Sequence, residues 1–379
     1  MSYQDPTGKL SERLLDRAAP DRAAFEDLVV VPVFAVIVAL ILGALTMLAT
    51  NVDLPTIGRS YLALLEGSVG SLNAISETLT AAAPLTLAGL GLALGFRAGM
   101  FNIGAEGQLL VGGMATVIVG FSFSGLPAVI HLPLALLAGA VAGGLYASIA
   151  GWLRAATGAH EVISTIMLNL ISYRLIDYML RLPFIQREGR ADPVSKSVLD
   201  SAELPRLLSF LDPNLRVHAG VFLMLAAVAI VYWLLFKTRL GFEFRTSGES
   251  PDAARYAGMR AGVLIVLVMG LAGALAGLAG ANQVLGVLGR ATPGFSAGIG
   301  FDAISVALLG RSHPIGVLLA GLLFGALEAG GRQMQVDAGV SIDLISIIQA
   351  LIIIFIAAPL LVRTLFPWGF SKLTKPSEE

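Results

Sequence analysis

Long apolar segments constrain this chain more than any other feature of its sequence. The segment 28–49 carries no charged residue, and a helix of that length can cross a hydrocarbon core of about 30 Å. Only 13% of the residues are charged and 56% are hydrophobic, whereas about a quarter of the residues in a soluble domain are charged. The sequence therefore predicts an integral membrane protein.

About ten such segments follow one another, so we expect an all-α polytopic fold with an inverted pseudo-repeat, as in many transporters. The candidate spans are 28–49, 79–96, 101–121, 126–152, 162–180, 218–236, 263–285, 299–309, 315–329 and 344–362. The eighth is too short to cross alone. It is interpreted as a half-helix, or as part of a broken helix with the ninth, which requires protein or a cavity to cover the backbone. The expected number of spans is therefore nine or ten.

Lysine and arginine residues orient the spans, because cytoplasmic loops carry more of them. The consistent arrangement has a cytoplasmic N-terminal tail (1–27), a transmembrane domain (28–362) and a cytoplasmic C-terminal tail (363–379). The loop 237–262 then lies inside and the loop 182–217 outside. The external segment 54–76 has apolar residues near helical spacing and is expected to lie on the membrane surface. The mostly polar N-terminus does not have the pattern of a secretory signal peptide.

Several kinds of chemistry are not expected. The chain has no cysteine for disulfides or thiolate metal sites, and its four histidines do not follow a metal-ligand spacing. We therefore expect neither a metal nor another cofactor. A net charge of −1 gives no indication of nucleic-acid binding. The sequence has no GxxxxGK[ST] phosphate loop and no HExxH motif, so we do not expect an enzyme or an ATPase.

The cytoplasmic loop contains the signals of a short helix. Ser250 is a suitable N-cap, Pro251 fits the first helical position, and Gly258 is placed to end the helix. The residues expected between them include Asp252, Ala253, Ala254, Arg255 and Tyr256. This helix is either an ordinary surface element or a docking element for a soluble partner. In the second case we expect Ala254 on its contact face.

Sequence motifs resemble those of a known transporter class. The run GESPDAARYAGM, followed by GLAGALAGLAG, resembles the coupling-helix region of permeases of ATP-binding-cassette (ABC) importers for ribose-type sugars, branched-chain amino acids and nucleosides. FRAGMFNIGAEGQ, EVISTIMLNLI and GFDAISVALLGRSHPIGVLLAGLLFGAL are similar to nucleoside permeases that work with basic-membrane-protein-type lipoproteins. Within that group, NIGAEGQ is similar to the longer of two paired permeases.

The resemblance implies the membrane-spanning permease subunit of an ATP-driven importer in a bacterial cell membrane. The implied cargo is a purine or other nucleoside, with a sugar as the alternative. The implied partners are a second, different permease, an ATP-binding subunit, and an external lipoprotein or periplasmic substrate-binding protein. Membrane lipid surrounds such a chain.

The segment FNIGAEGQ places polar groups between two apolar runs. Asn102 and Glu106 lie four residues apart, on one helical face, and Gln108 points elsewhere. Charged groups inside a bilayer are costly and normally face protein or water. These side chains either line a cavity beside a broken helix or hold the structure together. In the structural interpretation, Glu106 pairs with Arg97 or Arg154, or caps a neighbouring helix.

Residues of other spans extend this candidate path for the cargo. Its expected lining is Asn102, Gln108, Asn169 and Asn282, with Phe101 or Phe301 placed to stack on a base. Asp302 opens the short eighth segment, either as an acidic residue of the first helical turn or as a path residue. An uncharged nucleoside calls for amides, hydroxyls and aromatic faces rather than a strong charge. Glu106 and Asp302 also keep open a second hypothesis, a transporter driven by an ion gradient.

Overall fold

The computed structural model of the chain describes residues 31–189, 191–341 and 343–357. The expected tails 1–27 and 363–379, the start of the first expected span and the end of the last lie outside the described residues. The helices fall into two compact units. One holds the first and last described helices, and the other extends over Gly58–Ile342.

The smaller unit pairs two apolar helices. α3 (Val31–Ala49) packs against α15 (Asp343–Ala357). Val38 and Phe355 are buried at this contact, and they are surrounded by Phe34, Leu42 and Leu351. α4 (Leu54–Val69) carries the chain on into the larger unit.

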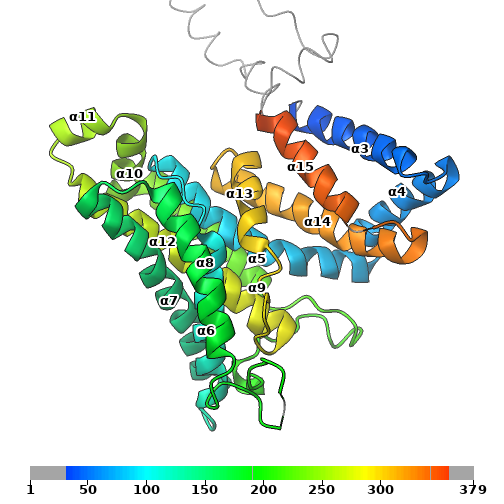
Figure 1. Ribbon diagram of the computed structural model, residues 1–379, viewed down its shortest axis with the longest axis horizontal. Coiled ribbons are helices and arrows are strands. Elements are labelled where there is room, and N and C mark those ends of the chain that lie inside the picture. The colour runs from blue at the N-terminus through cyan, green and yellow to red at the C-terminus, as the bar shows by residue number, and fades with distance from the viewer. Residues whose placement is uncertain (1–30, 190, 342, 358–379) are drawn as a thin grey trace, which may run out of the picture. The chain divides into compact units, whose positions relative to one another are not determined.

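The larger unit consists of helices that follow the expected spans (Figure 1). They are α5 (Leu72–Arg97), α6 (Ala105–Ser122), α7 (Ala128–Thr157), α8 (Glu161–Met179), α9 (Gly220–Lys237), α12 (Ala261–Gln283), α13 (Ile299–Leu309) and α14 (Pro314–Ala338). No strand occurs in the part of the chain that the structure describes, which confirms the all-α fold.

Six of the described helices are long and apolar enough to cross a membrane, namely α5, α6, α7, α9, α14 and the continuous helix Ala261–Leu288 that contains α12. Each of the other expected spans also coincides with a helix: α3, α8, α13 and α15. Whether those four cross the membrane stays a prediction, and so does the total of nine or ten spans.

α5 forms the core of the larger unit. It packs against α9, α12, α13 and α14 (Figure 1), and residues 80–95 are all buried. Small residues let the backbones approach closely. A Cβ atom on Gly91 would lie 2.5 Å from the carbonyl oxygen of Ala272, and one on Gly277 would lie 2.1 Å from that of Gly139. These glycines therefore hold the helices together by close packing.

The eighth and ninth expected spans form a broken pair. α13 has 11 residues, which corresponds to about 16 Å of helix, or roughly half of a hydrocarbon core. A turn at 310–313 follows, and α14 begins at Pro314. Arg311 and Ser312 in this turn have φ values of 50° and 52°, a left-handed conformation that costs energy for residues other than glycine. The turn is therefore strained.

Two of the expected loops contain helices. The segment 54–76 comprises α4, which ends at Val69, and the start of α5, which begins at Leu72, and its place on the external membrane surface stays a prediction. Ser68 of α4 also donates a hydrogen bond to the carbonyl of Ala326 in α14 at 2.6 Å, so α4 packs on protein as well. The loop 237–262 holds two helices, α10 (Arg239–Glu249) and α11 (Pro251–Tyr256), of which only the second was expected.

Candidate functional site

The segment between α5 and α6 folds around a pair of amides. Asn102 and Gln108 are both buried and exchange two hydrogen bonds of 3.1 Å, one in each direction. The Asn102 Oδ1 also accepts from the Gly104 backbone N–H at 2.8 Å. The sequence analysis expected Gln108 to point away from Asn102 and both amides to line the cargo path. The structure brings them together, but as partners of one another.

Asn169 of α8 fixes the same segment. Its Oδ1 accepts from the Gly107 backbone N–H at 2.8 Å, and its Nδ2 donates to the Ile103 carbonyl at 2.9 Å. The Ile103 N–H donates to the Thr165 hydroxyl at 3.2 Å. A Cβ atom on Gly107 would lie 2.9 Å from Asn169 Oδ1 and 2.8 Å from Ser172 Oγ. Glycine is needed here because α8 approaches the backbone so closely.

Glu106 joins three elements. Its carboxylate is buried and accepts hydrogen bonds from the Tyr173 hydroxyl of α8 at 3.1 Å and from the Gly300 N–H of α13 at 2.9 Å. The Ser296 hydroxyl also donates to it. The structure thus places Glu106 at the N-terminus of α13, where a negative charge is favourable. Of the alternatives for Glu106, this arrangement corresponds to capping of a neighbouring helix, and not to pairing with Arg97 or Arg154.

Ser296 lies at the centre of GFSAG (294–298), whose letters match a nucleophile motif of hydrolases. That motif requires a strand leading into a turn and a helix. No strand precedes it among the described residues, and the hydroxyl is buried and bound to Glu106. The role of Ser296 is therefore structural: its hydroxyl holds the Glu106 carboxylate in place.

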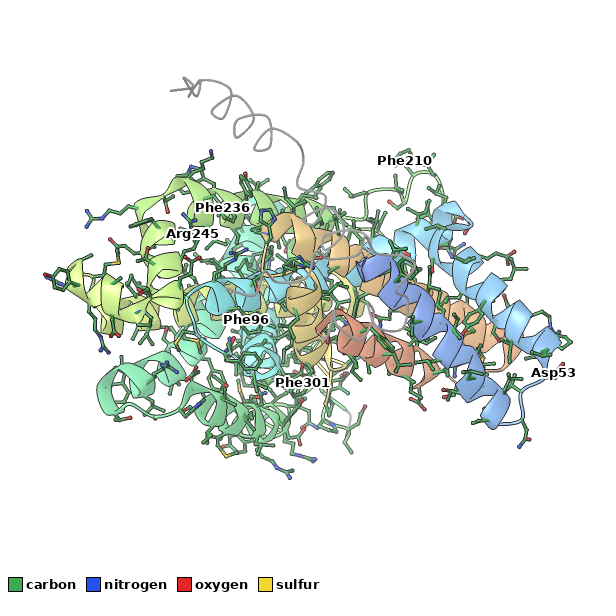
Figure 2. The ribbon with its side chains drawn as sticks, turned by 90° about the horizontal axis from the view of Figure 1, so that it is seen from above. Asp53, Phe96, Phe210, Phe236, Arg245 and Phe301 are labelled. Carbon is green, nitrogen blue, oxygen red and sulfur yellow. The ribbon has the colours of Figure 1, made fainter. Side chains whose placement is uncertain are left out.

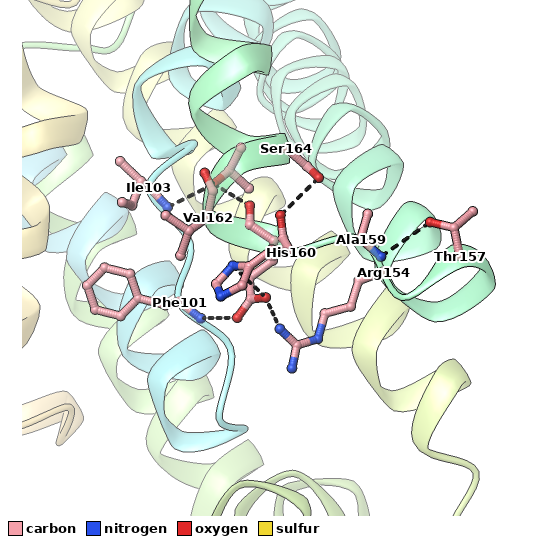
Figure 3. Close-up of polar contacts among 10 residues, drawn as sticks. Phe101, Ile103, Arg154, Thr157, Ala159, His160, Val162 and Ser164 are labelled. Atoms are coloured by element: carbon pink, nitrogen blue, oxygen red, sulfur yellow. Dashed lines mark hydrogen bonds and ion pairs between the residues drawn. The ribbon is translucent and has the colours of Figure 1, made fainter.

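An ion pair between α7 and α8 also supports the segment between α5 and α6, at the end where the sequence predicts the cytoplasmic side. Arg154 at the end of α7 contacts the Glu161 carboxylate at the start of α8. Glu161 also accepts from the Phe101 backbone N–H at 3.3 Å. Figure 3 shows the Phe101 ring pointing away from Arg154. This ring stacks on Phe96 with centroids 5.0 Å apart and remains 41% exposed.

Asn282 differs from the other amides. It is fully buried, and neither of its side-chain polar atoms has a partner among the described residues. His218, just before α9, is its neighbour, since a Cβ on Gly220 would touch both side chains. Burial, together with the positive charges of Arg216 and Arg206, lowers the pKa of His218 to about 4. The imidazole is therefore neutral at pH 7. The sequence analysis did not include His218, although a histidine at the edge of an apolar segment was a visible signal.

Phe301 and Asp302 lie in the first turn of α13 and are both exposed. The structure thus divides the predicted site residues into two groups. Five are buried in the protein, namely Asn102, Glu106, Gln108, Asn169 and Asn282. The other three have exposed side chains, namely Phe101, Phe301 and Asp302.

Charged residues of α14 were missed by the sequence analysis. Glu328 accepts from Arg332 at 2.9 Å, and Arg332 also reaches Glu77 of α5 at 3.3 Å. Arg216 of the expected external loop contacts the same Glu77 oxygen at 3.2 Å. Glu328 and Arg332 keep more than two fifths of their side chains exposed. Charges on an apolar helix are costly in lipid unless they pair with one another or face water or protein. A Glu four residues before an Arg within an apolar helix was the signal.

The helices α10 and α11 of the loop 237–262 differ from the prediction in detail. Ser250 occupies the N-cap of α11 without a side-chain capping bond, Pro251 is in the first turn, and Gly258 has a φ of 78° after the helix. Ala254 is buried, so its expected place on a contact face is wrong. Tyr256 is 98% exposed instead.

Comparison with known proteins gives one family and several relatives. The family model described as "Branched-chain amino acid transport system / permease component" matches residues 74–357. The guanosine ABC transporter permease protein NupP of Bacillus subtilis is 40% identical over 334 residues, covering 88% of this chain and 94% of that protein. The glucose ABC transporter permease protein TsgB13 of Haloferax volcanii is 41% identical over 332 residues, 86% of each chain.

Further relatives come as a pair from Lactococcus lactis. The nucleoside ABC transporter permease protein NupB is 35% identical over 354 residues, covering 92% of this chain and 96% of its own. The nucleoside ABC transporter permease protein NupC of the same strain is 27% identical over 261 residues, covering 66% and 79%. No solved structure matches this chain.

Proposed function

This chain belongs to the family of branched-chain amino acid transport system permease components, and we propose that within this family its cargo is a nucleoside, with a purine nucleoside as the first candidate. The chain is the membrane-spanning permease subunit of an ABC importer and not an enzyme. A permease of this kind acts with an ATP-binding subunit and a substrate-binding protein. ATP hydrolysis is the task of that other subunit.

The observation that carries the nucleoside proposal is the similarity to two nucleoside permeases along nearly their whole length. The relatives from Bacillus subtilis and Lactococcus lactis are named for guanosine and for nucleosides. The relative from Haloferax volcanii, named for glucose, has a similar identity and makes a sugar the second candidate. Exposed aromatic rings at Phe101 and Phe301 favour a base, because bases can stack on such faces.

Uptake measurements test the cargo. Cells that lack this gene, with and without the gene supplied on a plasmid, are given labelled guanosine, adenosine, uridine, glucose or ribose. We expect uptake of guanosine or adenosine to depend on the gene, and unlabelled purine nucleosides to compete with it. Gene-dependent uptake of glucose or ribose alone would instead support the sugar candidate.

We propose that the second permease is a different chain. In Lactococcus lactis two nucleoside permeases match this chain at unequal identity, 35% and 27%, which supports a pair of unlike subunits. The exposed polar residues Asp302, Glu328 and Arg332 support a face that meets this partner or an aqueous path, because lipid would be a poor environment for them.

We propose that the translocation path follows the exposed residues Phe101, Phe301 and Asp302. The buried amides Asn102, Gln108 and Asn169 then stand behind this surface and fix its shape. Asn282, with its unpaired amide, is the buried candidate best suited to bind water or cargo when the path opens. The path is expected to bind weakly, since cargo must also leave it.

The proposed orientation gives a direct prediction. The chain has no cysteine, so single cysteines can be labelled without background. Glu188 in the loop 182–217 is exposed, and so is Tyr256 in the loop 237–262. We expect an impermeant thiol reagent to label Glu188→Cys in intact cells, and Tyr256→Cys only after the membrane is opened. The reverse pattern would invert the proposed topology.

A further inference from the structure

α10 touches the segment that ends α5 without any intervening side chain. A Cβ atom on Gly248 would lie 2.3 Å from the Arg97 carbonyl oxygen and 2.8 Å from the Gly99 nitrogen. Gly99 has a φ of 70°, and its own Cβ would lie 3.1 Å from the Gly248 Cα. A contact between two backbones has no flexible side chain that could absorb a displacement. A movement of α10 is therefore passed on to residues 97–99.

Arg97 extends this contact to the turn between α13 and α14. Its Nε donates to the Ser312 carbonyl at 3.0 Å, and its Nη2 lies 3.4 Å from the Arg311 carbonyl. Both of these turn residues have the left-handed backbone described above. Arginine is suited to this role because its planar group can bind two acceptors at once. Residues 97–99 thus connect α10 with the strained turn.

A second chain of contacts leads from α10 to the same turn. The Arg245 guanidinium of α10 lies over the Phe236 ring of α9, 5.3 Å from its centroid (Figure 2). The Phe236 ring packs against the His313 imidazole with centroids 5.3 Å apart. His313 is the last residue of the turn, directly before α14. α10 therefore reaches residues 310–313 by two separate routes.

The other end of α13 is held as well. Glu106 binds the Gly300 N–H, and a Cβ on Gly300 would lie 2.3 Å from the Glu106 backbone nitrogen. α6 begins only a few residues after Gly99 in the chain. One end of the half-helix is thus attached to the end of α5 and the other to the start of α6, on the two sides of the segment that links these helices. A displacement of that segment acts on α13 from both ends.

We propose that α10 passes movements of the loop 237–262, which the proposed orientation places on the side of the ATP-binding subunit, to the half-helix α13, through Gly248 and Arg97 on one route and through Arg245, Phe236 and His313 on the other. This inference rests on the proposed function. Phe301 and Asp302 lie at the start of α13, so the relay moves the proposed path surface. The residues of the two routes are positioning residues: they act on the path through α13 and do not touch the cargo.

The test uses the complete importer in proteoliposomes and measures cargo imported per ATP hydrolysed. The variants are Gly248→Ala for the first route, Phe236→Leu for the second, and both together. Gly262→Ala is the glycine control, because its Cβ would meet only the Ala155 Cβ at 3.6 Å. Phe222→Leu is the aromatic control, since Phe222 lies on the same helix as Phe236, outside α10, and is 61% exposed.

We expect each single variant to lower the import-to-hydrolysis ratio severalfold and the double variant to lower it by roughly fivefold or more, with hydrolysis retained. Both controls should keep the wild-type ratio. An unchanged ratio in the double variant overturns the relay. So does a loss of import and hydrolysis in parallel, which indicates a structural role only.

Arg97→Gln and Arg97→Lys keep the test decisive if Gly248→Ala does not assemble. The glutamine variant should lower the ratio, and lysine, which retains a donor toward Ser312, should restore part of it. Equal ratios in the wild type and Arg97→Gln would contradict the first route. A wild-type importer that moves neither nucleoside nor sugar would contradict the proposed function, whereas a loss of coupling confined to the variants concerns the relay alone.

Discussion

Asn169→Leu is expected to destabilise the protein strongly. The change removes the two hydrogen bonds that hold the Gly107 N–H and the Ile103 carbonyl, and both groups are then left unpaired inside the protein. A buried polar group without a partner costs about 1–3 kcal/mol, so the expected loss is about 2–6 kcal/mol. The amount of monodisperse protein and the thermal midpoint in detergent, measured by intrinsic fluorescence, check this result.

Asn282→Leu is the matched control for that experiment. The same substitution at Asn282 breaks no hydrogen bond formed within the described residues, and it removes an amide that is costly to bury. We expect a thermal midpoint equal to or above that of the wild type, together with slower uptake if Asn282 meets cargo or water. Equal destabilisation by the two changes would contradict the division between structural and path amides.

Arg154→Leu is expected to have the second large effect. Glu161 retains only 5% of its side-chain exposure, so loss of its cationic partner leaves a buried carboxylate. Removing one partner of a buried ion pair costs about 3–5 kcal/mol. Because Arg154 is 34% exposed, water screens part of the pair, and we expect up to about 3 kcal/mol. The thermal midpoint at pH 7.5 measures the loss.

Two further variants show whether the unpaired charge of Glu161 causes the loss of stability in Arg154→Leu. Glu161→Gln in the Arg154→Leu background removes the unpaired charge, and we expect it to recover a large part of the midpoint. Arg239→Leu breaks an ion pair with Glu243 in which the arginine is 92% exposed, and it should cost less than about 1 kcal/mol. If Arg239→Leu and Arg154→Leu lower the midpoint equally, burial of Glu161 is not the cause.

The loop 237–262 shows how far sequence patterns reach. The capping signals at Pro251 and Gly258 predicted a short helix, and α11 is present there. The patterns did not predict which face is covered, and Ala254, expected at a docking surface, is buried. A six-residue helix has too few positions for an apolar stripe to indicate its orientation, so the contacts with the rest of the chain decide it.

The FNIGAEGQ segment shows the same division for the site. Its polar residues marked a special place within an apolar chain, because amides and carboxylates are costly in a membrane unless they have partners. The sequence did not reveal those partners. Asn102 pairs with Gln108, and Glu106 binds Gly300, which lies 194 positions further along the chain. No local pattern contains information about a contact across that separation.

The sequence by itself determined the membrane class, the helical fold, the approximate helix positions and the break between α13 and α14. These depend on the length of apolar runs and on local breakers, which act within a few residues of one another. Only the tertiary structure decided which polar groups are satisfied by the protein and which remain exposed or unpaired. It also decided that α10 reaches the turn at 310–313 by two routes. Hydrogen-bond satisfaction and close glycine packing depend on which helices become neighbours, and the whole fold sets that arrangement.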